Sequence, residues 1–212
     1  MTTLSLEFSS SQRSVALTRD DSVLCETVEA GGRGTAAFSM IEKVLAASKT
    51  EREQIEMICV GLGPGSYTGI RAAISIAQGW QLAQPIRLAG ISSIQAIVAQ
   101  ARAEQIFGKV CVAVDAQRNE FYLATFEVTQ SGWNEIEPLK IVSPAEVRSR
   151  AAKDSILVGP GVTGWFTEGR NIFPSASHLG KIAAHSHLDL SAEQLQPIYL
   201  RETTFGKANP IV

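Results

Sequence analysis

Histidine and cysteine are scarce in this sequence, which narrows the metal and redox chemistry open to it. Each occurs three times among 212 residues. Cys25, Cys59 and Cys111 stand in apolar, strand-like runs and never at the Cys-x-x-Cys spacing of a redox pair or zinc site. We therefore interpret the three cysteines as reduced core residues.

The histidines form no metal-ligand pattern either. His178 and His185 stand two helical turns apart, too far for one ion, and His185 and His187 would diverge on a helix. There is no His-Glu-x-x-His helix, and Ser66 lacks the Gly-x-Ser-x-Gly frame of a nucleophile elbow. The sequence thus predicts no metal site, no zinc peptidase and no serine hydrolase.

An excess of one charge and a long apolar run are missing as well. Nineteen basic and 21 acidic residues give a net charge of −2, which provides no basic field for nucleic acid. Trp80, Trp133 and Trp165 are scattered and lack basic neighbours, so we expect no direct nucleic-acid binding by the chain alone. Without a basic leader or a membrane-length apolar run, a cytoplasmic protein that makes no membrane contact is expected.

A glycine-rich loop between a strand and a helix is the most informative stretch that the sequence does contain. It follows the apolar run 55–60 and precedes a helix that ends before Pro85. Its characteristic residues are Gly61, Gly63, Pro64, Gly65, Ser66, Thr68 and Gly69, followed by Arg71.

Two interpretations of this loop remain open. Its backbone N–H groups and the helix N-terminus would suit the phosphates of a nucleotide. Alternatively, the glycines only let the strand turn back into a closely packed helix, with Ser66 or Thr68 as the N-cap. Neither the Walker pattern nor the dinucleotide pattern matches, because Gly69-Ile70-Arg71 ends the loop and Ser66 stands where a third glycine is needed.

The order of predicted elements suggests an internal duplication. Three short strands (4–8, 13–18, 23–28) lead to a helix (36–47) that Thr35 can cap. Strand 55–60 and the helix after the glycine loop (68–83) come next. Strand 86–89 then leads to a helix capped by Ser92 or Ser93. From residue 110 a similar order returns, with strands 110–114, 121–128, 136–142 and 155–158 and a helix capped by Ser143 with Pro144 at its first position.

A second glycine turn, Gly159-Pro160-Gly161, repeats the first one after its own strand. Two halves that each join a meander to an α/β unit predict the duplicated α/β fold of actin-like ATPases and sugar kinases, abbreviated ASKHA. We expect an N-terminal half over residues 1–104 and a C-terminal half over residues 105–212, facing each other across a cleft.

Each half carries an acid at the end of its first strand, Glu7 in one and Asp115 in the other. In active members of this architecture, such carboxylates hold a metal ion and the attacking water. In the plainer interpretation both are turn acceptors that bond local N–H groups. Asp115, Arg118 and Glu120 could likewise line the cleft or pair with one another across a hairpin.

Three motifs resemble the TsaB (YeaZ) family in order and spacing, over nearly the whole chain. They are Gly61-x-Gly63-Pro64-Gly65-Ser66-Tyr67-Thr68-Gly69-Ile70-Arg71, Asp115-Ala116-Gln117-Arg118-Asn119-Glu120-Phe121-Tyr122 and Pro197-Ile198-Tyr199-Leu200-Arg201. The resemblance implies a bacterial, non-catalytic partner of a TsaD-like protein. That complex places threonylcarbamoyl on the adenosine beside the anticodon of certain tRNAs, and a TsaE-like ATPase joins through the complex.

Two departures from the family pattern argue against catalysis in the cleft. Glu7-Phe8-Ser9 stands where the family has Asp-Thr-Ser, and no histidine precedes the first helix. The catalytic sister family binds its metal through two histidines on that helix. The resemblance implies no required cofactor, with ATP or ADP bound weakly or only in the complex. The alternative is a small ATP-dependent phosphotransferase or ATPase that uses the loop Gly63–Gly69 with Glu7 and Asp115.

The first two helices are apolar on more than one face. One face can pack on the sheet, and the other is predicted to pack against a second surface. The resemblance implies that these helices join a TsaD-like protein, or a second copy of the chain, in a helical bundle. Alternatively, the helices cover each other and the second half. The expected interface residues are Phe38, Met40, Ile41, Val44, Ile70, Ala73, Ile74, Ala77 and Trp80.

Overall fold

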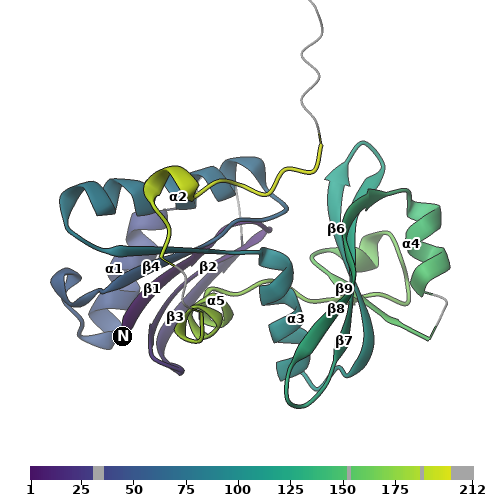
Figure 1. The fold of residues 1–212 in the computed structure, drawn as a ribbon, viewed down its shortest axis with the longest axis horizontal. Coiled ribbons are helices and arrows are strands. Elements are labelled where there is room, and N and C mark those ends of the chain that lie inside the picture. Colours follow the sequence, from purple (N-terminus) through teal and green to yellow (C-terminus); the bar gives the residue numbers. More distant parts are fainter. Residues whose placement is uncertain (31–35, 152–153, 187–188, 202–212) are drawn as a thin grey trace, which may run out of the picture.

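Two five-stranded sheets, each flanked by helices, form the computed structural model of this chain (Figure 1). The structure describes residues 1–30, 36–151, 154–186 and 189–201. The predicted cap Thr35 and His187 lie outside these described residues. Among the described residues, no helix is both long and apolar enough to cross a membrane.

Both sheets have the same strand order when their strands are counted from the start of each half. The first runs β3-β2-β1-β4-β5 and the second runs β8-β7-β6-β9-β10. The strands are β1 Thr2–Glu7, β2 Gln12–Arg19, β3 Ser22–Ala30, β4 Met57–Gly61, β5 Arg87–Ile91, β6 Gly108–Gln117, β7 Glu120–Val128, β8 Trp133–Val142, β9 Ile156–Gly159 and β10 Arg170–Asn171.

In each half an antiparallel meander is extended by parallel strands, because β4 pairs with β1 and β9 pairs with β6 in parallel. The predicted fold class is therefore confirmed. Among the strands, the sequence prediction lacks β10, which is two residues long.

The helices are α1 Ala37–Ser48, α2 Tyr67–Ala83, α3 Ser93–Ala103, α4 Pro144–Ala151 and α5 Ala176–Ala184, with short 3-10 turns at Arg52–Gln54, Val162–Gly164 and Ala192–Gln194. The first sheet is covered by α1 and α2 on one face and by α3 and α5 on the other, whereas α4 packs on the second sheet. On β4, Ile58 and Val60 pack in the same core cluster as α1 and α2. Met57 and Cys59 pack with α3 and α5, as the period of two along a strand requires.

The duplication is incomplete after the second glycine turn. In the first half the loop leads into α2, whereas in the second half it leads only into the 3-10 turn Val162–Gly164. Within the described residues, the second half therefore has no helix that matches α2.

The C-terminal helix α5 packs against the first sheet. Gly180 permits this approach, because a Cβ there would lie 2.6 Å from Thr18 Oγ1. Farther along, Leu190 pairs with Leu88 of β5, and Leu195 joins the core under α1 and α2. The predicted C-terminal half over 105–212 is thus corrected: α5, Leu190 and Leu195 pack with the N-terminal half, through contacts that no local pattern reveals.

The three cysteines are free thiols on strands, as predicted. Cys59 and Cys111 are buried in the two halves, while Cys25 on β3 is only partly buried. Burial raises the pKa of the Cys59 thiol, so this group stays protonated.

Candidate functional site

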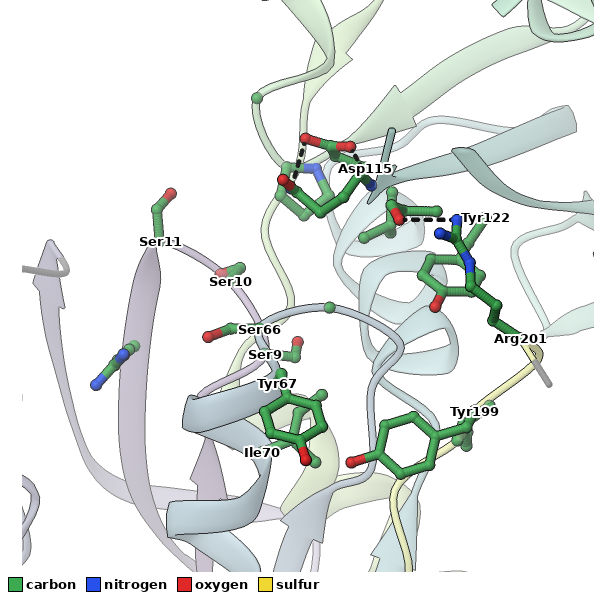
Figure 2. Close-up of a pocket in the computed structure, with 18 residues that line it drawn as sticks. Ser9, Ser10, Ser11, Ser66, Tyr67, Ile70, Asp115, Tyr122, Tyr199 and Arg201 are labelled. Atoms are coloured by element: carbon green, nitrogen blue, oxygen red, sulfur yellow. Dashed lines mark hydrogen bonds between the residues drawn. The ribbon is translucent and has the colours of Figure 1, made fainter. Parts of the chain in front are cut away.

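A cleft of about 690 Å³ lies where the two halves meet. It is formed by the β1–β2 turn and the glycine loop from one half, and by the β6–β7 turn and the second glycine turn from the other. Figure 2 shows Ser9, Ser10 and Ser66 on one side, Asp115 and Arg201 on the other, and Tyr199 near Tyr67.

The glycine loop packs backbone to backbone on the β1–β2 turn. Gly65 has a φ of +150°, and a Cβ there would overlap the carbonyl oxygen of Ser9. A Cβ on Gly69 would overlap the carbonyl oxygen of Phe8. Ser66 is the N-cap of α2, and its Oγ accepts a hydrogen bond from Gly69 N at 3.3 Å, which confirms one of the two predicted caps.

Several backbone N–H groups of this loop already donate hydrogen bonds within the protein. Leu62 N donates to Ile91 O and Gly63 N to Ser93 Oγ. Ser66 N donates to Ser9 O and Gly69 N to Ser66 Oγ. A phosphate cradle needs such donors to point at a ligand. The geometry therefore favours the interpretation in which the loop positions α2 over the sheet.

Glu7 does not line the cleft. Its side chain is fully buried, with Ser9 N donating to Oε1 at 2.7 Å and Ser93 Oγ donating to Oε2 at 2.8 Å. The absence of a side chain on Gly61 makes room for this carboxyl group. The expectation that Glu7 is a cleft acid is corrected: because it points beneath the glycine loop, it acts as an acceptor that joins β1 to the start of α3.

Burial raises the pKa of Glu7 above its ordinary value of 4.5, although the hydrogen bonds from Ser9 and Ser93 oppose this shift. The folded state thus holds the proton more strongly than the unfolded chain does. The stabilisation is complete below the ordinary pKa and is lost as pH rises through the raised pKa.

We predict that Glu7→Gln becomes more stable relative to the wild type as pH rises from about 4 to about 8, because the amide keeps an acceptor and cannot ionise. Urea unfolding at several pH values measures this difference. Asp20→Asn is the control of opposite sign at lower pH, because the N-terminal amino group lowers the pKa of Asp20, so the stability that Asp20 supplies is lost as pH falls below its ordinary value of 3.8. A difference between Glu7→Gln and wild type that stays constant with pH would contradict this account of Glu7.

Asp115 lies at the cleft, but its carboxylate is engaged in its own turn. Oδ1 accepts from Gln117 N at 2.7 Å, and Oδ2 accepts from Gln117 Nε2 at 3.0 Å. The turn is left-handed, with positive φ at Gln117, Arg118 and Asn119. Glu120 pairs with Arg201, so the interpretation in which Asp115, Arg118 and Glu120 pair with one another across the hairpin is wrong for Glu120.

The C-terminal motif connects the other two motifs, a role that sequence reasoning missed. Ile198 N donates to Leu62 O at 2.9 Å, and Arg71 Nε donates to Tyr199 Oη at 3.0 Å. Arg71 also stacks on the Tyr67 ring, 4.0 Å from its centroid. Arg201 reaches Ala116 O and Glu120 in the other half. The segment therefore fastens the glycine loop to the β6–β7 turn.

Most of the expected interface residues belong to the core of the monomer. Met40, Ile41, Val44, Ile70, Ala73, Ile74 and Ala77 are all buried within one cluster under α1 and α2. Trp80 is partly buried, and only Phe38 is well exposed, at 69%. The expectation is corrected for these seven residues, because the sheet, and no partner, covers the stripe that they form.

The opposite side of α2 carries small residues and one large apolar residue. Its exposed positions recur every three or four residues and so share one face, here called the α2 face: Thr68, Ala72, Ser75, Gly79 and Leu82. The Leu82 side chain is 91% exposed, and beyond the backbone of its own helix turn nothing lies within 4 Å of a Cβ built on Gly79. A neighbouring helix can approach such a surface closely.

The duplicated sheets, the glycine loops and the cleft between the halves define a protein of the ASKHA class. A solved structure supports the fold alone, the activator of 2-hydroxyisocaproyl-CoA dehydratase from Clostridium difficile with bound ADPNP, at 10% identity and a TM-score of 0.51. It is matched over 87% of this chain and 94% of that chain. YeaZ from Pseudomonas aeruginosa is 27% identical, with a TM-score of 0.79 over 94% of this chain and 99% of that chain.

Two relatives described as tRNA threonylcarbamoyladenosine biosynthesis protein TsaB are similar over most of their length. The Escherichia coli protein is 28% identical over 81% of each chain. The Haemophilus influenzae protein is 31% identical over 81% of this chain and 80% of its own. Residues 35–163 match the family model described as TsaD, tRNA N6-adenosine threonylcarbamoyltransferase. The chain belongs to the TsaB (YeaZ) family.

Proposed function

We propose that this chain is a non-catalytic subunit that binds and supports a TsaD-like sister protein during threonylcarbamoylation of the adenosine next to the anticodon of tRNA. Membership of the TsaB family supports the pathway. The observation that carries the non-catalytic role is the placement of Glu7, because the acid that would serve the cleft is buried and hydrogen-bonded beneath the loop.

The α2 face supports the proposed contact with the sister protein. Small residues let a partner helix approach closely, while Leu82 supplies exposed apolar area. In the absence of the sister protein, a second copy of this chain uses the same face to form a homodimer. A TsaE-like ATPase joins through the complex and makes no essential contact with the α2 face.

No cofactor is required in this proposal. ATP or ADP binds weakly to this chain, or only at its junction with a partner. The rival function is a small phosphotransferase or ATPase that uses the glycine loop with Glu7 and Asp115. It is disfavoured because Asp115 alone of the two acids lines the cleft and because four loop donors are already engaged.

We predict that the purified chain with ATP and magnesium releases phosphate no faster than a protein-free control. The reason is that one carboxylate, itself held by Gln117, cannot position both a metal ion and an attacking water. A coupled phosphate assay of the wild type and of Asp115→Ala measures this. Sustained release by the wild type that Asp115→Ala abolishes would favour the rival function.

A further inference from the structure

A second hollow, of about 870 Å³, lies between α3, α5 and the β7–β8 turn and shares no residue with the cleft. In Figure 1, α3 stands between α5 and the second sheet, so this α3–α5 groove opens where the two halves join. Its volume falls in the range of small-molecule sites. Nothing in the proposed function makes use of it.

Aromatic rings form one wall of the α3–α5 groove. Phe107 is 37% exposed, and Trp133 at the start of β8 is partly exposed. The β7–β8 turn is rigid, because Gly132 N donates to Thr129 Oγ1 and Thr129 N donates to Gly132 O. Parts of both rings are accessible in the groove, where a planar group can stack on them.

Cationic groups occupy the same groove. Arg102 donates from Nε and Nη2 to Gln130 O, at 3.1 and 2.6 Å, which holds its guanidinium group beside the β7–β8 turn. Lys181 is exposed on α5 and forms no ion pair with a carboxylate of the described residues. The acid of the groove, Asp21, is engaged by His185 Nε2 at 2.6 Å.

His178 lines the groove as an uncharged group. Burial and the charge of Lys181 lower its pKa to about 4. Its Nδ1 lies 2.7 Å from Ser175 Oγ, so Nε2 is the ring nitrogen left for a ligand. Among the described residues neither Arg102 nor Lys181 pairs with a carboxylate, so the groove presents two positive charges next to the neutral ring of His178.

We propose that the α3–α5 groove binds a nucleoside phosphate, with the base stacked on Phe107 and Trp133 and the phosphate paired with Lys181 and Arg102. A free mononucleotide and a single nucleotide of an RNA chain supply the same chemistry. The sequence expectation of no direct nucleic-acid binding rested on tryptophans without basic neighbours. The fold changes that premise, because it places Arg102 and Lys181 in the same hollow as Trp133.

The test is a calorimetric titration of the full-length chain with each of four ligands: AMP, adenosine, inorganic phosphate and a single-stranded oligoadenylate. AMP or the oligonucleotide should bind at least about tenfold more tightly than adenosine or phosphate, since stacking and charge both contribute. Lys181→Glu should weaken that binding about tenfold, and Phe107→Ser should do so to a similar extent.

Arg170→Glu is the matched control, because it makes the same change in net charge at an exposed position beside α4, away from the groove. This variant should bind within about twofold of wild type, since screening weakens distant charges. If the oligonucleotide binds more tightly than AMP, the natural ligand is a nucleotide of an RNA chain. If the two bind equally, the natural ligand is a free nucleotide. Absence of binding by both, or equal losses in Lys181→Glu and Arg170→Glu, would overturn the proposal.

Discussion

Replacing Ser75 by Arg should strongly weaken both the complex with the TsaD-like protein and the homodimer, while the monomer stays folded. Ser75 lies in the middle of the α2 face, between Ala72 and Gly79, where close helix packing leaves no room for a long side chain. The guanidinium group would also be buried without a partner. We expect association to weaken by about 3 kcal/mol, or roughly a hundredfold.

Sedimentation velocity of the variant, alone and mixed with the sister protein, measures this effect. Ser149→Arg is the control, because it makes the same substitution at an exposed position of α4 in the other half. It should leave both associations unchanged. If Ser75→Arg still forms the dimer and the complex at wild-type concentrations, the partner binds elsewhere on the chain.

Replacing Gly65 by Val should destabilise the fold by about 4 kcal/mol, from backbone strain and from steric overlap together. Gly65 has a φ that side chains rarely adopt, and its missing Cβ leaves space for the Ser9 carbonyl oxygen. Ser66 N also donates to that oxygen, at 2.7 Å. The substitution therefore separates the glycine loop from the β1–β2 turn and misplaces the N-terminus of α2.

Gly164→Val is the control for this prediction, because Gly164 is exposed, has no left-handed φ and lies away from both the cleft and the α2 face, with open space where its Cβ would stand. Its change in stability should stay within about 0.5 kcal/mol, since neither strain nor overlap opposes a side chain there. Urea unfolding followed by circular dichroism measures both variants. A stable Gly65→Val chain that had selectively lost nucleotide binding would instead show that the loop is a ligand site.

The sequence predicts the architecture well because its local signals are strong and mutually consistent. Ser66 and Ser92 each cap a helix as expected, and Ser143 with Pro144 begins α4. The repeated strand and glycine-turn pattern reveals the duplication, which the matching strand orders confirm. These features depend on neighbours along the chain, which is why they can be recognised without a structure.

The errors arise where the decisive contacts are distant in sequence. On α2 both faces contain apolar or small residues, so the pattern cannot indicate that Ile74 meets the sheet and that Ser75 faces outward. Glu7 resembles a cleft acid until Ser93 is found to donate to it. Trp133 lacks basic neighbours along the chain, whereas Arg102 and Lys181 line the same hollow in the structure.

The most direct test of the proposed function is the yield of threonylcarbamoyladenosine on a tRNA substrate that the TsaD-like protein modifies with its other components present. We expect modification to require this chain, to persist with Asp115→Ala and to be lost with Ser75→Arg. That pattern would show that binding through the α2 face, and no chemistry in the cleft, is what this chain supplies. Full modification in its absence, or loss of modification with a correctly assembled Asp115→Ala complex, would contradict the proposal.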